Sequence, residues 1–337
     1  MKTVVVLGAG ASADFGLPLG DEMYNQARDL LEEFLRALRS EARRDSFYNY
    51  SQMVAFVKSH ARYKSLLPFM LEDLENGSKH ISDKPISDLL DAMKVAPAYS
   101  LDTLALEYPE HADIIKVLCA QLITESLRKG FAKDENDNEI FKFNNKQIEN
   151  PKKNKQELLS NWIHLFCSMM RNELAVLDTQ KYGIVSFNYD RLFEKVGSFV
   201  WEHPTRNVGK FREIFDIKYP HGKIVWDTDH NGKSIFDPTC SEIVFAHNKP
   251  ENYLNDGAAD LVAEATKLIF LGFHFSQENI TTLGLKNCKP EEVVYQNYSG
   301  NRGLDTRVSD LGFKSVRSFK GPISAAILEG ELGELPS

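Results

Sequence analysis

A glycine-rich turn near the N-terminus has residue types and a spacing that suit phosphate binding. It follows the apolar run Thr3–Leu7 and consists of Gly8, Ala9, Gly10, Ala11 and Ser12. Gly8, Gly10 and Ala13 fit the G-x-G-x-x-G/A pattern, in which glycines let the backbone approach a pyrophosphate at the beginning of a helix. The pattern predicts a strand that enters a nucleotide-binding turn, and an ordinary tight turn is the alternative.

Polar side chains also follow a second apolar run, Ile184–Phe187. Ser186, Asn188 and Asp190 belong to the sequence SFNYD at the end of this run. Side chains of this kind can form hydrogen bonds with ribose hydroxyls or with a carboxamide. Asn188 or Asp190 can equally cap a following helix, and the residues alone leave both interpretations open.

His221 is the candidate general base. It precedes Gly222, a residue type that allows a ligand or another backbone segment to come close. A histidine with an unperturbed pKa of about 6.5 can accept a proton at neutral pH. A structural role is the alternative, and His274 is the rival base, although its aromatic neighbours favour packing.

The elements that must position these residues indicate an α/β fold. Beyond Gly183, strands predicted over Ile184–Phe187, Leu268–Leu271 and Glu292–Tyr295 alternate with helices, which is typical of a parallel sheet. Thr3–Leu7 finds its partner strands only after residue 180. We therefore expect a Rossmann-like doubly wound parallel sheet built from residues 1–24 and 180–337, with a helical insertion or subdomain over residues 25–179.

Local patterns inside and beyond the insertion predict further elements. Helices are expected over 21–38, 51–60, 64–74, 86–93, 111–129, 157–177 and 258–265, and a surface loop over 132–156. Asn231-Gly232 predicts a hairpin between Val225–Trp226 and Ser234–Phe236. Since ligands of open α/β sheets bind beyond the carboxyl ends of the strands, Gly272, Phe273 and Asn297 are further candidates at such ends.

Composition excludes several other classes of protein. The 337 residues carry a formal charge of −8, which argues against a broad nucleic-acid surface, and no apolar stretch is long enough for a membrane span. The four cysteines form no C-x-x-C pair, so we expect no bound metal and free thiols in a cytoplasmic protein. A secretory signal is disfavoured, because the first continuous apolar run covers only Val4–Leu7.

Taken in order, these motifs resemble those of the sirtuin family. The resemblance rests on GAGAS at Gly8–Ser12, GLP at Gly16–Pro18, S-x-N-x-D at Ser186–Asp190, His221-Gly222 and Gly272. It covers under half of the chain, and no motif covers the helical insertion. Within the family, the chain is most similar to the sirtuin-like NAD-hydrolysing domains of bacterial antiphage defence systems.

The resemblance implies a role for each matching residue. Gly8, Ala9, Gly10, Ala11, Ser12 and Pro18 would bind NAD+ around its pyrophosphate. Asn188 would orient the nicotinamide-side ribose or a water, with Ser186 and Asp190 near the nicotinamide. His221 would act as the base on a ribose hydroxyl. Gly272 and Phe273 would line the adenosine half, and Asn297 would lie on the adenine ribose.

Three departures from the family pattern bear on the reaction. Deacylating sirtuins have two zinc-binding cysteine pairs after the catalytic histidine, whereas this chain has only Cys240 in that interval. Leu19-Gly20-Asp21 replaces a segment that normally supplies a basic contact, and Phe187 stands where a glutamine is usual. These departures favour water over an acylated protein as the acceptor.

The predicted activity is therefore hydrolysis of NAD+ to nicotinamide and ADP-ribose, by a regulated antiphage or abortive-infection effector. We expect a homo-oligomer or a partner defence protein to gate it, and no membrane or direct nucleic-acid partner. The alternatives are a deacylase or ADP-ribosyltransferase, and a module that senses NAD or ADP-ribose without cleaving it. A dehydrogenase is disfavoured, because the chain is helical where the acidic second-strand residue would fall.

Overall fold

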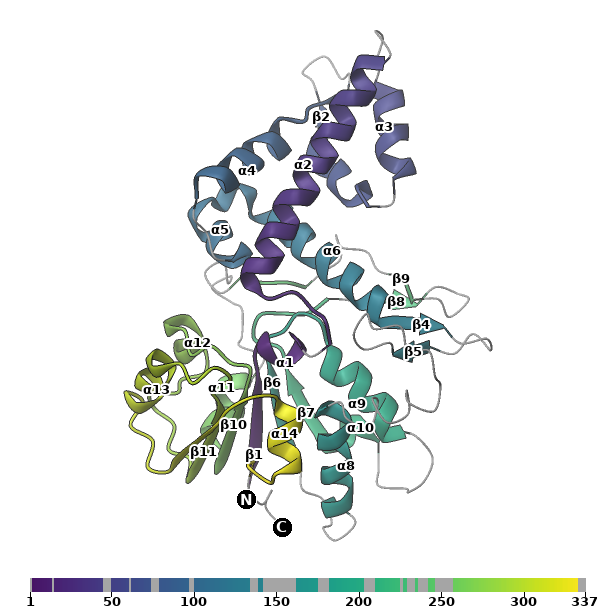
Figure 1. Ribbon diagram of the computed structural model, residues 1–337. Coiled ribbons are helices and arrows are strands. Elements are labelled where there is room, and N and C mark those ends of the chain that lie inside the picture. Colours follow the sequence, from purple (N-terminus) through teal and green to yellow (C-terminus); the bar gives the residue numbers. More distant parts are fainter. Residues whose placement is uncertain are drawn as a thin grey trace. The chain divides into compact units, whose positions relative to one another are not determined.

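The computed structural model describes most of the chain (Figure 1). The described residues are 2–13, 15–44, 50–60, 62–73, 79–96, 100–133, 139–141, 162–174, 182–202, 210–224, 227–228, 234–235, 242–245 and 257–332. They divide into two compact units. The sheet unit comprises Met1–Leu17, Leu127–Lys223 and Lys249–Ser337, and the helical unit comprises Pro18–Ser126 and Ile224–Asn248.

A six-stranded, wholly parallel sheet organises the sheet unit. Its strands are β1 (Thr3–Leu7), β6 (Tyr182–Ser186), β7 (Phe215–Lys218), β10 (Lys267–Leu271), β11 (Glu292–Gln296) and β12 (Val316–Phe319). They lie in the order β12-β11-β10-β1-β6-β7. Taken from the β7 end and numbered by appearance within this sheet, the order is 3-2-1-4-5-6, the doubly wound order of dinucleotide-binding folds. The predicted parallel α/β fold class is thus confirmed.

Register aligns the carboxyl ends of the central strands. Leu7 of β1 pairs with Leu271 of β10 on one side and with Ser186 of β6 on the other. The chain goes from β1 to β6 and β7 on one side of β1, and then to β10, β11 and β12 on the other. The switch point therefore lies between β1 and β10, which is where open α/β sheets bind their ligands.

Helices cover both faces of this sheet, which explains why its inner strands are continuous apolar runs. Successive side chains of β1 point to opposite faces, and Val4 and Val6 pack in one core cluster with residues of α11 (Ala258–Ala263), α12 (Gln277–Thr282) and α13 (Arg302–Ser309). Other helices of the unit are α1 (Gly10–Ala13), α8 (Trp162–Leu174), α9 (Leu192–Glu202), α10 (Phe211–Ile214) and α14 (Ile323–Leu328).

An aromatic cluster fills the core around β7. Phe193 of α9 stacks on Trp162 of α8 with ring centroids 6.1 Å apart, and it meets Phe215 of β7 at 5.6 Å. Phe211 of α10 lies 4.7 Å from Phe215. These contacts attach α8, α9 and α10 to the sheet, so α8 belongs to the sheet unit although residues 25–179 were predicted to form the insertion.

The helical unit is built around the long helix α2 (Gly20–Arg44). The apolar face predicted from its periodicity is buried, including Leu30, Leu31, Phe34 and Leu38. Its other elements are α3 (Tyr50–Ser59), η1 (Lys64–Met70), β2 (Leu71–Asp73), β3 (Lys79–Ile81), α4 (Lys84–Val95), α5 (Leu101–Glu107), η2 (Pro109–His111), β8 (Asp227–Thr228) and β9 (Ser234–Ile235). Helix α6 (Ala112–Gly130) begins in this unit. Tyr24 of α2 donates to Met93 O of α4 at 2.6 Å, which joins the two helices.

Several local predictions differ from the structure. No strand was predicted over residues 215–218, where the structure has β7. Residues 132–156 were predicted as a loop, yet β4 (Phe131–Lys133) and β5 (Glu139–Phe141) pair there as antiparallel strands. The predicted hairpin corresponds to β8 and β9, with Val225, Trp226 and Phe236 outside the described residues. Among the described helices, none has the length and apolarity that crossing a membrane would require.

Candidate functional site

Buried polar side chains of the sheet unit gather at one edge of the sheet. Among the described residues of this unit, ten polar or charged side chains are buried, and eight of them lie at or beyond the carboxyl ends of strands. These eight are Ser12, Ser186, Asn188, Asp190, Glu194, His221, Gln296 and Asn297. Since a buried polar group is costly unless it is paired, their partners define what this edge does.

The glycines of the first turn pack against Gly272, the residue that follows β10. Gly8 N donates to Leu271 O at 3.0 Å, and Gly10 N donates to Gly272 O at 3.1 Å. A Cβ on Gly8 would lie 2.4 Å from Gly272 O, and a Cβ on Gly272 would lie 2.1 Å from Ala11 N. Glycine is therefore required here for the close approach of two backbone segments at the switch point. This packing explains the glycines without a phosphate contact.

Helix α1 after this turn is only four residues long, Gly10–Ala13. The sequence pattern implies a longer helix whose N-terminus would bind phosphate, and one turn of helix has a much weaker dipole. The long helix α2 begins at Gly20 and belongs to the helical unit, as does Pro18, which is buried there. The predicted roles of Gly8, Ala9, Gly10, Ala11 and Pro18 toward NAD+ stay predictions.

Asn188 links the end of β6 to the first turn. Its Nδ2 donates to Gly8 O at 2.9 Å and to Ser12 Oγ at 2.8 Å. The hydroxyl of Ser186 lies 3.3 Å from Asn188 N, which donates to it. Both amide hydrogens of Asn188 are thus used within the protein, while Oδ1 accepts no hydrogen bond from the described residues. This oxygen is the atom of Asn188 that can accept a hydrogen bond from a ligand or a water.

Asp190 completes this group through Ser12. Burial raises the pKa of the Asp190 carboxyl, and hydrogen bonds from Leu192 N and the Ser12 hydroxyl act in the opposite direction. Leu192 N donates to Asp190 Oδ1 at 2.7 Å at the beginning of α9, so Asp190 does cap a helix, as its alternative interpretation predicts. Ser12 lies between an amide donor and a carboxyl acceptor, which orders its hydroxyl.

His221 approaches this group through an aromatic contact. Its imidazole lies edge-on to Phe187, the residue before Asn188, with ring centroids 4.8 Å apart, and it is buried. Phe187 also meets Phe273 edge-on at 5.1 Å. The structure therefore brings together residues that follow β6, β7 and β10, and Phe187 lies between the other two rings.

His274 has a different environment. It is exposed, and its Nε2 lies 3.2 Å from Arg307 Nη1. Partial desolvation of the ring and the charge of Arg307 both lower the pKa of His274. A histidine held against a guanidinium is poorly placed to gain a proton, so this contact favours His221 as the base.

Asn297 lies at the end of β11, where its side chain holds the next loop. Its Nδ2 donates to Asn301 O and to Asp305 Oδ1, at 3.0 and 2.7 Å, and its Oδ1 accepts from Asn301 N at 2.7 Å. The amide is therefore engaged on both sides with the beginning of α13. A contact of Asn297 with the adenine ribose stays a prediction, and it would require one of these bonds to change.

Three residues at this edge were not predicted as site residues. Gln296 accepts from Gly272 N at 2.8 Å and donates to Gly321 O at 2.7 Å, which ties the loops after β10 and β12 together. Trp162 Nε1 donates to Ala11 O at 2.8 Å. Glu194 binds Arg191, with which it shares an i,i+3 spacing on the sequence. That spacing was a usable signal for Glu194, whereas Gln296 and Trp162 act through long-range contacts that no local pattern reveals.

Metal ligation has no support in the described part of the chain. No group of three or more His, Cys, Asp or Glu side chains there is arranged to hold an ion. Cys119 and Cys167 are buried and Cys288 is partly buried, and none of the three forms a disulfide, while Cys240 lies outside the described residues.

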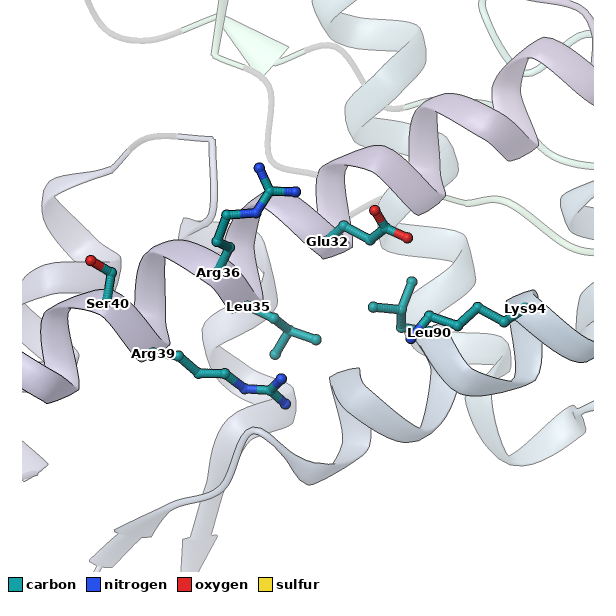
Figure 2. A pocket seen from close by; sticks show the side chains of 7 residues that line it. All are labelled: Glu32, Leu35, Arg36, Arg39, Ser40, Leu90 and Lys94. Carbon is teal, nitrogen blue, oxygen red and sulfur yellow. The ribbon is translucent and has the colours of Figure 1, made fainter.

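A separate hollow of about 630 Å³ lies in the helical unit, between α2 and α4 (Figure 2). Its floor includes Leu35 and Leu90, and Glu32, Arg36, Arg39, Ser40 and Lys94 complete the lining. Arg39 is paired with Asp83 at 3.3 Å and Lys94 with Asp91 at 3.0 Å, so its basic groups are largely neutralised. None of the candidate site residues lines it.

The strand order, the glycine contact at the switch point and the polar residues beyond the strand ends define a Rossmann-type α/β unit. Comparisons with known proteins add the following. No protein-family model matches the chain, and no curated protein matches it. Among solved structures, it is similar to a mutant of Sir2 homologues in complex with 2'-O-acetyl ADP ribose, with 12% identity over 97% of this chain and 89% of that chain and a TM-score of 0.40.

A second similar structure is a Sir2 homologue with a His-to-Asn substitution, in complex with ADP ribose. It shares 11% identity over 99% of this chain and 95% of that chain, with a TM-score of 0.33. Both structures are Sir2 homologues. The fold class of this chain rests on the strand order and register described above.

Proposed function

We propose that the protein is an NAD+ glycohydrolase, which cleaves the nicotinamide–ribose bond and releases nicotinamide and ADP-ribose. The observation that supports this most is the meeting of Ser12, Asn188 and Asp190 beside the His221 turn, at the carboxyl edge of a doubly wound sheet. A site of this composition offers hydrogen-bond acceptors for ribose and a base for one of its hydroxyls. The sirtuin-like motifs in the sequence point to the same substrate.

In the proposed reaction, the bond from C1′ of the ribose to the nicotinamide nitrogen breaks, and its electron pair leaves with the nicotinamide. Positive charge then develops on C1′ and the ring oxygen. His221 would accept a proton from a ribose hydroxyl. Water adds to C1′, and the proton that it loses returns to that ribose oxygen, so the one proton released overall leaves from His221 to solvent. Asn188 Oδ1 would orient the ribose or the water, and Asp190 would lie near the nicotinamide.

The sequence favours water over a protein as the acceptor. A protein acceptor, whether of an acyl-lysine or of an ADP-ribosyl group, needs a cleft that binds a peptide, and no sequence feature supports one. The zinc-binding cysteine pairs of deacylases are also absent from the sequence. We further propose that the enzyme is a cytoplasmic antiphage effector. Since unchecked NAD+ loss would harm the host, a homo-oligomer or a partner defence protein would gate it, and the helical unit is the place we propose for this control.

A non-catalytic NAD or ADP-ribose sensor is the second candidate function. The observation in its favour is that both amide hydrogens of Asn188 bind the protein's own first turn. An asparagine used in this way would shape a binding site without taking part in a reaction. A sensor would bind the dinucleotide without releasing nicotinamide.

Nicotinamide release from NAD+ by the purified chain, with and without candidate activators, tests the proposal. We expect His221→Ala to lower kcat by about 10²–10⁴-fold, the range for loss of a general base. Asn188→Ala should lower it by about 10²-fold through misplacement of the reacting groups. His274→Ala is the matched control and should leave kcat unchanged. Binding of NAD+ without any release would favour the sensor, and full activity in His221→Ala would contradict the assignment of the base.

A further inference from the structure

Glu194, in the first turn of α9, connects three segments of the carboxyl edge. Its carboxylate accepts a hydrogen bond from Arg191 Nε at 2.8 Å and one from the Tyr219 hydroxyl at 3.2 Å. Arg212 of α10 also donates to it. Arg191 belongs to the loop after β6 that carries Asn188 and Asp190, and Tyr219 begins the turn after β7 that carries His221.

The charge on Glu194 is maintained despite burial. Burial alone would raise the pKa of the carboxyl, but hydrogen bonds and charge from Arg191 and Arg212 outweigh it and hold the pKa below its usual value. Burial and the neighbouring Glu194 charge raise the pKa of Tyr219, so its hydroxyl keeps its proton and donates. Buried ion pairs add little net stability compared with apolar packing, so geometry is the better reason for this cluster.

The backbone at Arg191 shows what the cluster holds in place. Arg191 has a φ of +54°, and among the described residues it is the one non-glycine residue with positive φ. An L-residue in this region is strained. The bond from Arg191 Nε to Glu194 and the bond from Leu192 N to Asp190 lie on either side of this bend. Glu194 thus stabilises the conformation that places Asn188 and Asp190 at the end of β6.

The same carboxylate holds the His221 turn. Tyr219 is buried, and its carbonyl accepts from Gly222 N at 2.9 Å, which closes the turn around His221 with Gly222 at a φ of +73°. The Tyr219 hydroxyl points to Glu194, so one carboxylate sets the position of the turn and of the Asn188 loop together.

We propose that Glu194 is a positioning residue that couples the Asn188–Arg191 loop to the Tyr219–Gly222 turn, so that Asn188 and His221 act at one substrate. The catalytic part of this inference rests on the function proposed above. The coupling itself concerns this chain alone and can be measured without any substrate.

The first experiment is amide hydrogen exchange on the purified chain. Glu194→Gln removes the charge and Tyr219→Phe removes only the link to the turn. Both should raise exchange in residues 188–192 and in residues 219–222 by about 10-fold, the scale of local opening. The control is Glu292→Gln, which removes a carboxylate bound to Lys267 and Arg317 at the opposite end of the sheet and should leave both segments unchanged.

The second experiment separates kcat from KM for nicotinamide release. Glu194→Gln should lower kcat by about 10²-fold, as small misplacements of reacting groups do, and change KM by less than about 3-fold. Tyr219→Phe should lower kcat less. The fold-loss in kcat of the double variant should be smaller than the product of the two single fold-losses, because the residues share one interaction.

These outcomes separate the two proposals. If Tyr219→Phe alters exchange only in residues 219–222 and leaves residues 188–192 as in the wild type, the coupling is wrong, whatever the activity. If exchange behaves as expected but the wild type releases no nicotinamide, the coupling stands and the hydrolase proposal fails. Unchanged kcat in a folded Glu194→Gln variant, with His221→Ala inactive, would also overturn the positioning role.

Discussion

At the amino-terminal edge of the sheet, Glu292 binds Lys267 and Arg317, whereas at the carboxyl edge Glu194 binds Arg191, Arg212 and Tyr219. The amino-edge cluster joins residues of three neighbouring strands, whose positions the backbone ladder already sets. The carboxyl-edge cluster joins residues of loops and helix ends. There the ion pair and the Tyr219 hydroxyl link segments whose relative positions no strand ladder sets.

The difference extends to the other buried polar groups. In the described sheet unit, only Thr3 and Lys267 are buried polar residues at the amino edge, against eight at the carboxyl edge. Polar networks that hold loops rigid at a switch point are typical of ligand sites, since loops on a rigid scaffold carry function. The buried polar groups of the carboxyl edge thus hold loops and turns, whereas those of the amino edge belong to strands, and three pairs of variants test this contrast.

The largest effect on stability should come from Gly272→Ala. Its φ of +59° disfavours alanine, and the new Cβ would lie 2.1 Å from Ala11 N, so backbone must move. Gly284→Ala is the matched control, because Gly284 has a φ of +62° and nothing within 4 Å of the added Cβ. We expect about 1–2 kcal/mol from the φ strain in the control and about 1–3 kcal/mol more in Gly272→Ala from overpacking.

Urea unfolding of the two variants measures this difference. Equal losses in free energy of unfolding would mean that the turn after β1 can shift to accommodate the added Cβ. The close backbone contact at the switch point would then not require glycine at position 272. A larger loss for Gly272→Ala would establish that Gly8, Gly10 and Gly272 are required by packing, whether or not a phosphate also binds there.

These glycines show how far sequence reasoning reaches. Short β-branched runs that end in glycine or polar residues predicted β1, β6, β10 and β11 to within about two residues, because buried parallel strands are continuous apolar runs. From these positions, the common edge for Ser12 and Asn188 followed, whereas His221 follows β7, which no apolar run predicted. The contact of Gly8 and Gly10 with Gly272 could not be predicted from the sequence, because Gly272 lies far away along the chain.

Other parts of the site depended on contacts that no local pattern shows. β7 has the sequence FDIK, whose alternation and brevity give no apolar run. Asn297 was assigned from its place after β11, and only the structure shows its amide bound to Asn301 and Asp305. The bend at Arg191 likewise depends on Glu194 and on the long-range bond between Glu194 and Tyr219.

An intermediate effect is expected when a buried and an exposed ion-pair partner are compared in stability. The side chain of Glu194 is 11% exposed, whereas that of Arg317, which binds Glu292, is 47% exposed. Glu194→Gln should lower the free energy of unfolding by about 2 kcal/mol, below the range for breaking a fully buried pair. Arg317→Gln leaves Glu292 paired with the buried Lys267, so it should lower the free energy of unfolding by about 1 kcal/mol, close to an exposed pair.

Thermal and urea unfolding of both variants at low and high salt check this comparison. Salt should reduce the effect of Arg317→Gln more than that of Glu194→Gln, since exposed charges are screened more strongly. An effect of Arg317→Gln that equals or exceeds that of Glu194→Gln would remove this contrast between the two clusters.

The smallest expected effect is on the pH dependence of stability, in which Asp190 and Glu194 should differ in sign. Burial raises the pKa of the Asp190 carboxyl above its ordinary value of 3.8, so the unfolded chain ionises first. Stability therefore falls as the pH rises from 3.8 through the folded-state pKa. Burial raises the pKa of the Glu194 carboxyl, but hydrogen bonds and charge from Arg191 and Arg212 outweigh it and lower the pKa below 4.5. The charged carboxylate therefore contributes stability above pH 4.5, and this stability is lost as the pH falls through the folded-state pKa. Asp190→Asn should therefore gain stability relative to the wild type as the pH rises, while Glu194→Gln loses it. Urea unfolding between pH 3.5 and 7 measures both slopes, and slopes of the same sign in the two variants would contradict the raised pKa of the Asp190 carboxyl.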